Sequence, residues 1–316
     1  MPKPENGSVS ARRPKIAFVG TGGAARGIAH LGVLRACEEL GIAPEIFVGA
    51  SAGAVVAATY GQGIPLDVLL DGYRLPWKRR HRGPRFHLST FMGAPALRDL
   101  LSPGYLASGV FSLDKLERYL RSHLPENDFR RVKNQIFVTA VDIDRGQRVL
   151  FGRGYDAETP LSQAVAASCC VPGLFRPYPI RGTYHLDGEV VRTLSADVAV
   201  AAGADVVIIS NIYRPADASS DPRSVARRGP LKVINQTLNI VLTEKERRGV
   251  DLYSMANPGV RFIDIAPDIG MFGYLNRFAA RSLVMRGYRS ALRALARAKA
   301  QGVFDLNRME SASHLN

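Results

Sequence analysis

The stretch that most constrains this chain is residues 45–61, EIFVGASAGAVVAATYG. The apolar run at residues 46–48 is typical of a short buried strand, and the small residues at 54–59 predict a helix that packs closely on a sheet. Between them, residues 49–53 match the pattern G-x-S-x-G. In a strand–turn–helix context this pattern predicts a nucleophile elbow, a tight turn that exposes the hydroxyl of Ser51 at the end of the sheet.

The predicted elbow requires small residues on both sides of Ser51. Because the turn is tight, Gly49 and Gly53 must be small. The first turn of the following helix offers unpaired N–H groups and a positive dipole end, which suit a developing oxyanion. Taken alone, the stretch is equally compatible with a Gly/Ala-rich turn that has no chemical role.

A second glycine-rich stretch, GTGGAARG at residues 20–27, follows an apolar strand predicted at residues 15–19 and precedes a helix predicted to end near Leu40. A loop in this position presents backbone N–H groups to an anion, either the phosphates of a dinucleotide or an oxyanion. The glycines do not match G-x-G-x-x-G, and no acidic residue ends the next strand. The neighbouring elbow therefore favours an oxyanion hole.

The charge of the chain bears on its partners. A net charge of +14 and a sequence pI of about 10.0 predict attraction to polyanions, namely nucleic acid, an anionic membrane or acidic substrates. Residues 74–87 combine the only tryptophan with many bases, as is typical of a membrane interface or a nucleic-acid-binding segment. A solvated charged surface is the alternative in both cases.

The cysteines and the apolar runs of the sequence indicate the cellular compartment that we expect. Cys37, Cys169 and Cys170 are too few and too unevenly spaced for a disulfide framework or a zinc site. No apolar run predicts a signal peptide or a transmembrane helix, so we expect a cytoplasmic protein whose membrane contact, if it has any, is peripheral.

Predicted strands and helices alternate along the chain, which indicates an α/β fold with a mostly parallel central sheet and helices on both faces. One predicted helix, at residues 112–124, has Ser112 as its N-cap. Residues 274–300 predict a basic amphipathic helix that either lies on anionic lipid or packs its apolar face on its own domain. Its basic stripe consists of Arg286, Arg289, Arg293 and Arg297.

Three motifs in order resemble the patatin-like phospholipase family. They are the loop and helix at residues 20–42, the elbow at 49–53, and Asp187-Gly188 within residues 184–211. At these places that family carries a G-G-G-x-R-G loop, a G-x-S-x-G elbow and Asp-Gly-Gly or Asp-Gly-Ala. The resemblance covers residues 15–212 and implies a three-layer patatin-like α/β fold.

We accordingly divide the chain into five parts. They are a disordered N-terminus at residues 1–13, a catalytic core at 14–212, a basic Pro/Ser-rich linker at 213–230, a helical C-terminal part at 231–302 that packs on the same domain, and a tail at 303–316.

The resemblance also implies a catalytic dyad, with Ser51 as the nucleophile and Asp187 as the general base. Backbone N–H groups of Gly22, Gly23 and Ala24 would form the oxyanion hole. The supporting positions are Arg26, Gly27, Gly49, Gly53 and Gly188. A triad would need a histidine after the acid, and only His314 follows Asp187. The other histidines are His30, His81, His87, His123 and His185. No metal or organic cofactor is expected.

Two positions depart from the family pattern. Ala24 stands where the third glycine would be. An L-residue pays about 1–2 kcal/mol in a left-handed conformation, so the oxyanion hole would be best preserved with a negative φ at Ala24. Glu189 stands where glycine or alanine would follow Asp-Gly. Its side chain could crowd the dyad or, if it turns inward, raise the pKa of Asp187 through its negative charge.

We therefore expect a lipid acyl hydrolase of the phospholipase A or lysophospholipase type, which cleaves carboxylic esters of membrane lipids through an acyl-enzyme. The alternative is a catalytically weakened patatin-fold module that binds lipid or protein. Charge alone suggests a nucleic-acid-binding protein, but no nucleic-acid motif accompanies it, so nucleic acid is not expected as a partner. Nothing in the sequence indicates an oligomeric state.

Overall fold

The computed structural model describes residues 12–72, 80–81, 90, 93, 104–105, 108–191, 195–212, 224–269 and 280–305. The predicted disordered start, the basic segment at residues 74–87, the linker and the tail lie mostly outside these ranges.

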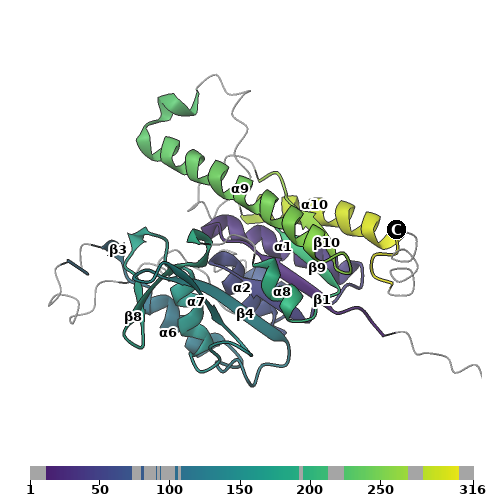
Figure 1. Ribbon diagram of the computed structural model, residues 1–316, viewed down its shortest axis with the longest axis horizontal. Coiled ribbons are helices and arrows are strands. Elements are labelled where there is room, and N and C mark those ends of the chain that lie inside the picture. The colour runs from purple at the N-terminus through teal and green to yellow at the C-terminus, as the bar shows by residue number, and fades with distance from the viewer. Residues whose placement is uncertain are drawn as a thin grey trace, which may run out of the picture.

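A central sheet of eight strands organises the described part of the chain (Figure 1). Its strands are β1 (Ile16–Gly20), β2 (Ile46–Gly49), β4 (Gln135–Asp142), β5 (Gln147–Phe151), β7 (Tyr178–Ile180), β8 (Thr183–Asp187), β9 (Val206–Ser210) and β10 (Arg261–Ile265). Their order is β10-β9-β1-β2-β4-β8-β7, with β5 paired to β4. The first five strands in this order run parallel, whereas β5, β7 and β8 pair antiparallel with their neighbours. A separate pair consists of β3 (Gly109–Phe111) and β6 (Gly173–Phe175).

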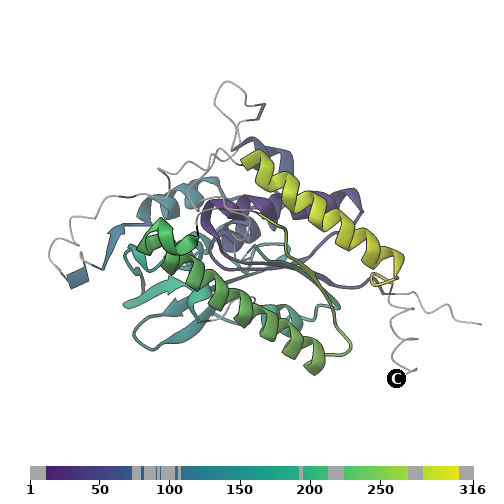
Figure 2. The same cartoon turned by 90° about the horizontal axis from the view of Figure 1, so that it is seen from above.

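Helices cover both faces of the sheet. On one face lie α1 (Ala29–Glu39), α2 (Ala52–Tyr60), α3 (Leu66–Asp71), α6 (Asp114–His123), α7 (Leu161–Ser168) and α10 (Ala280–Ala300). On the other lie α8 (Ala196–Ala201) and α9 (Pro230–Ala256), and short 3-10 helices span Ala24–Ile28 (η1), Gly188–Val190 (η4) and Val225–Arg228 (η5). Figure 2 shows α1 and α10 on one side of the sheet and α9 on the other. The predicted three-layer α/β fold, with a mostly parallel sheet and helices on both faces, is confirmed.

The two cores explain why the central strands are apolar throughout. In β1, Phe18 faces the core beneath α1 and α2, whereas Ala17 and Val19 face the smaller core beneath α8. Successive side chains of a strand point to opposite faces, so a parallel strand covered on both sides has no solvent-facing position.

Helix α10 packs directly on the backbone of α1. A Cβ added at Gly287 would lie 2.2 Å from the carbonyl oxygen of Ala29, and one added at Gly32 would lie 2.0 Å from that of Val284. Further along the pair, Lys299 Nζ donates to the carbonyl of Leu40 at 2.7 Å. The basic helix therefore buries one face on its own fold. None of the described helices is both long and apolar enough to cross a bilayer.

The predicted N-cap at Ser112 is wrong by one residue. Helix α6 begins at Asp114 with Leu113 as its N-cap, and the hydroxyl of Ser112 accepts from the N–H of Asp114 at 3.1 Å. The side chain thus satisfies a donor of the first turn from just outside the helix, which a sequence pattern cannot distinguish from the cap itself.

Candidate active site

The register of the sheet brings two strand ends together. Val138 of β4 pairs with Gly49 and also with β5, so β2 and β5 flank β4 on opposite edges. Ala140 pairs with Asp187 and also with β5, so β8 lies on the same edge as β2. Because β2 runs parallel to β4 and β8 runs antiparallel, their carboxyl ends approach each other beside Thr139. The residues that follow β2 and end β8 therefore meet.

The turn after β2 has the geometry of a nucleophile elbow. Ser51 has φ 52° and ψ −120°, a conformation that L-residues seldom adopt. A Cβ added at Gly53 would lie 2.1 Å from the carbonyl oxygen of Gly20, and one added at Gly49 would lie 2.4 Å from the backbone of Gly53. Gly53 must thus lack a side chain because the turn presses against the end of β1, and Gly49 because the start of α2 lies directly against it.

Two buried residues that sequence reasoning missed hold the elbow. The N–H of Ser51 donates to Ser168 Oγ at 2.8 Å, and the thiol of Cys169 donates to the carbonyl of Ser51 at 3.4 Å. Burial raises the pKa of Cys169 well above its usual value, so the thiol stays neutral. Both residues lie at the end of α7, and no local pattern in one sequence marks them as partners of a turn more than a hundred residues away.

The side chains of Ser51 and Asp187 form a hydrogen bond, with the serine hydroxyl donating to the carboxylate. The N–H of Glu189 also donates to Asp187 Oδ1, at 3.1 Å. Burial raises the pKa of Asp187 to about 6, although these two hydrogen bonds oppose the shift. At neutral pH the carboxylate is therefore ionised but more basic than an exposed aspartate.

The histidines of the described residues do not complete a triad. His30 is fully buried between Ser210 Oγ, 2.6 Å from Nδ1, and the carbonyl of Thr21, 2.8 Å from Nε2. Burial lowers the pKa of His30 to about 4, so the ring is neutral. His185 Nδ1 lies 3.3 Å from the carbonyl of Tyr178, and burial lowers its pKa as well. No described histidine forms a hydrogen bond with Ser51, and both buried rings serve the fold.

The glycine-rich loop after β1 is shorter than the sequence suggests, because η1 begins at Ala24. Gly23 has φ 137° and Ala24 has φ 50°. The negative φ that would best preserve the oxyanion hole is therefore not found at Ala24, and this alanine carries the cost of a left-handed conformation. Within the described ranges, no hydrogen bond is found from the N–H group of Gly23 or from that of Ala24.

The supporting positions make close backbone contacts. A Cβ added at Gly27 would lie 2.2 Å from Ala52 Cβ, so the loop fits against α2 only without a side chain there. A Cβ at Gly188 would lie 2.4 Å from the carbonyl oxygen of Thr139, which keeps Asp187 close to β4. Arg26 is buried within η1, and its N–H donates to the carbonyl of Gly23 at 3.1 Å.

Glu189 turns inward and reaches the glycine-rich loop. Its Oε1 accepts a hydrogen bond from the N–H of Gly22 at 2.6 Å, and the side chain is buried. Burial, and then the negative charge of Asp187, raise the pKa of Glu189 well above its usual value. Burial therefore raises the pKa of both carboxyl groups, and the charge of Asp187 adds to the effect of burial on Glu189.

Several known proteins are similar to this chain in sequence or in fold. An uncharacterized NTE family protein of Mycobacterium tuberculosis (strain ATCC 25618 / H37Rv) is 27% identical over 195 residues, which cover 62% of this chain and 48% of that protein. Lysophospholipase nte1 of Aspergillus fumigatus is 26% identical over 197 residues, which cover 62% of this chain and 12% of that protein. The crystal structure of VipD from Legionella pneumophila aligns with 91% of this chain and 67% of that chain, with a TM-score of 0.48 and 15% identity.

The chain spans about half the length of the mycobacterial proteins that it matches. A family model described as patatin-like phospholipase matches residues 19–200, a range that includes the glycine-rich loop, the elbow and Asp187. Because this range is more than half of the chain, the chain belongs to the patatin-like phospholipase family.

Proposed function

We propose that this protein is a serine acyl hydrolase that cleaves carboxylic ester bonds of membrane lipids, in the manner of a phospholipase A or lysophospholipase. The observation that carries the proposal is the hydrogen bond between the hydroxyl of Ser51, on a strained elbow, and the buried carboxylate of Asp187. A serine hydroxyl needs an adjacent base to become a nucleophile, and the elevated pKa of Asp187 suits that task.

The reaction would proceed in two steps. Asp187 takes the proton of Ser51 as Oγ attacks the ester carbonyl carbon, and backbone N–H groups at residues 22–24 hold the oxyanion. The tetrahedral intermediate collapses, and the leaving alcohol takes the proton from Asp187. Asp187 then takes a proton from water as the water oxygen attacks the acyl-serine. The second tetrahedral intermediate collapses, the fatty acid leaves, and Asp187 returns the proton to Ser51 Oγ. No step needs a group beyond these side chains, the loop and water.

The substrate class rests on the family and on one relative. Lysophospholipase nte1 carries a lysophospholipid activity in its name, and this chain aligns with it over 197 residues. A lipid ester with a long acyl chain is therefore the substrate that we propose.

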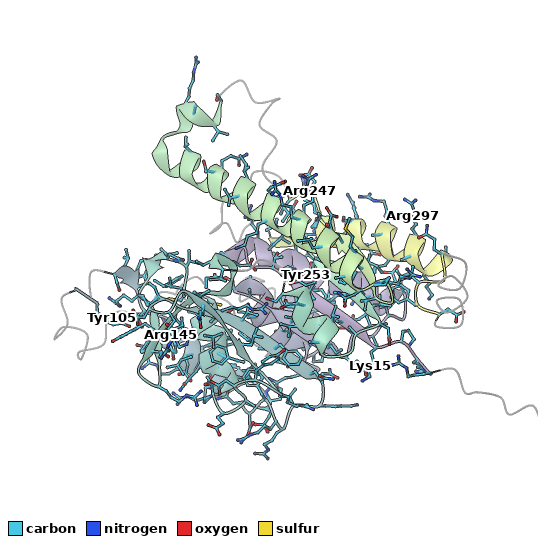
Figure 3. All side chains as sticks on the ribbon, in the orientation of Figure 1. Lys15, Tyr105, Arg145, Arg247, Tyr253 and Arg297 are labelled. Atoms are coloured by element: carbon cyan, nitrogen blue, oxygen red, sulfur yellow. The ribbon has the colours of Figure 1, made fainter. Side chains whose placement is uncertain are left out.

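A basic groove on α10 supports contact with an anionic membrane. The groove measures about 430 Å³, and its lining includes Arg286, Arg289, Arg293 and Met285. Arg286 donates to the carbonyl of Asp268 at 2.8 Å, whereas Arg289 and Arg293 have no carboxylate partner within the described ranges. Cationic side chains next to an exposed methionine suit phosphate groups above an acyl layer. Figure 3 shows Arg297 further along the same helix.

The proposal is tested with vesicles of anionic phospholipid. Wild type, Ser51→Ala and Asp187→Asn would be incubated with them, and released fatty acid and lysolipid detected by mass spectrometry. Release by the wild type alone supports the dyad, and the products identify the bond that is cut. Equal release by the wild type and Ser51→Ala would assign the activity to another residue or to a contaminant.

One observation favours the second candidate, a patatin-fold module that binds lipid without hydrolysing it. Glu189 accepts from Gly22, one of the proposed oxyanion donors. A soluble p-nitrophenyl ester separates the two candidates, because a folded, vesicle-bound wild type that never hydrolyses it would be a binding module.

A further inference from the structure

Glu189 brings a carboxyl oxygen to a backbone donor that the proposed reaction needs. The N–H of Gly22 donates to Glu189 Oε1 at 2.6 Å, a short distance for an N–H···O hydrogen bond. An oxyanion bound at Gly22 would occupy the same position relative to this donor, since both acceptors are oxygens in line with one N–H. Glu189 Oε1 and a substrate oxyanion cannot both occupy that position.

The backbone around Glu189 holds its side chain in this place. The N–H of Glu189 donates to Asp187 Oδ1 at 3.1 Å, and this bond fixes the first turn after β8. On the other side of η4, Lys245 Nζ of α9 donates to the carbonyls of Val190 and Val191. The short 3-10 helix is therefore tethered at both ends, and the glutamate side chain between them extends toward the loop.

The contact is also easily displaced. Glu189 Oε2 is buried and has no hydrogen-bond partner among the described residues. The bond to Gly22 is therefore the one hydrogen bond that the carboxyl group makes to described residues, and a group that accepts more strongly from Gly22 would replace it. A developing oxyanion is such a group, because charge-assisted hydrogen bonds are stronger than those to a neutral acceptor.

We propose that Glu189 is an internal occupant of the oxyanion hole, which the substrate carbonyl must displace from Gly22 before Ser51 attacks. This inference rests on the proposed acyl hydrolase function. Glu189 then sets how readily the site accepts an ester, and the Gly or Ala that the family pattern places after Asp-Gly would leave Gly22 open.

The test compares the wild type with Glu189→Ala and Glu189→Gln, and uses Glu158→Ala as a control for removal of a carboxylate. Glu158 is largely exposed and pairs with Arg181, which precedes the start of β8, whereas Asp187 ends that strand. Two readouts are taken: kcat/KM for p-nitrophenyl butyrate, and the amide resonance of Gly22 in ¹H–¹⁵N spectra of deuterated protein. The amide of Gly41, which donates to the carbonyl of Glu38, is the internal reference.

Glu189→Ala should raise kcat/KM by about three- to tenfold, the factor by which one net hydrogen bond favours an occupied donor. It should also move the Gly22 amide proton upfield and leave that of Gly41 in place. Glu189→Gln, whose amide oxygen can still accept from Gly22, should change both less. Glu158→Ala should change neither.

Two results would overturn the inference. One is an unchanged or lower kcat/KM in folded Glu189→Ala, which would make the carboxyl neutral or helpful to the reaction. The other is a Gly22 amide at the same position in the wild type and Glu189→Ala, which would mean that the contact is not formed in solution. Should no protein hydrolyse the ester, the proposed function fails, and the Gly22 resonance alone decides whether Glu189 occupies the hole.

Discussion

At the scale of single residues, burial gives Asp187 the basicity that its proposed role requires. Ordinary aspartate is too weakly basic to activate a serine at neutral pH, and burial raises the pKa of Asp187 to about 6. The base must be unprotonated to accept a proton, so activity should be lost as pH falls through this pKa and be present above it.

We therefore expect kcat/KM for a soluble ester to rise about tenfold for each pH unit below about 6 and to level off above it. A pH–rate profile of the wild type from pH 4 to 9 would measure this limb. His30, the fully buried ring near the loop, has a pKa lowered to about 4 and cannot supply a limb near 6. A half-maximal pH near 4 would argue that Asp187 behaves as an exposed carboxylate.

Sequence reasoning proposed Ser51 and Asp187 as a dyad because each stands in a local motif. It could not reach the contact of Glu189 with Gly22, which joins residues 167 positions apart, or that of Ser51 with Ser168, 117 positions apart. It also could not establish the backbone conformation of Ala24. The left-handed conformation there follows from how the loop leaves β1 and enters η1, and tertiary context outweighs the local preference of alanine.

At the scale of elements, glycines decide how closely helices approach. Gly287→Ala places a methyl group 2.2 Å from the carbonyl oxygen of Ala29, so α10 must move away from α1. Overpacking of this kind typically costs about 1–3 kcal/mol of unfolding free energy. We expect a loss of that size in urea denaturation.

Gly249 provides a matched control. It lies inside α9, and a Cβ there meets no described atom within 4 Å, so Gly249→Ala should stabilise the protein by about 0.5–1 kcal/mol through helix propensity alone. If both variants changed stability equally, the close packing of α1 on α10 would not exist in solution. In Figure 3, Arg247 lies on the outer side of the same helix and Tyr253 on the side toward α8.

The groove on α10 leads to a prediction about membranes. The double variant Arg289→Gln/Arg293→Gln should weaken binding to anionic vesicles by roughly 30-fold, since each arginine near such a surface contributes about 1 kcal/mol. Arg118→Gln/Arg121→Gln on α6 removes the same charge elsewhere and should have a smaller effect. Vesicle co-sedimentation measures both. Equal weakening by the two variants would mean that net charge, and not this groove, directs the protein to lipid.

At the scale of the whole molecule, sequence predicted the layers but not the convergence of strands. Alternation of strands and helices is visible in residue patterns, and the apolar runs of β1 and β9 indicate strands covered on both faces. That β2 and β8 share one edge of β4 depends on register and direction, which no single segment encodes. The position of the proposed dyad is thus a property of the assembled sheet.

The net charge of +14 also acts at this scale, and it leads to a prediction that separates recruitment from chemistry. Salt screens charges over a Debye length of about 10 Å at 0.1 M, so attraction to an anionic surface weakens as salt rises. The bond between Ser51 and Asp187 is buried and far less screened. Raising NaCl should therefore lower hydrolysis of anionic vesicles several-fold and leave hydrolysis of a soluble ester nearly unchanged. Hydrolysis of zwitterionic vesicles, assayed in parallel, should depend little on salt. An equal loss of activity with anionic vesicles, zwitterionic vesicles and the soluble ester would mean that salt acts on the fold or the dyad and not on recruitment.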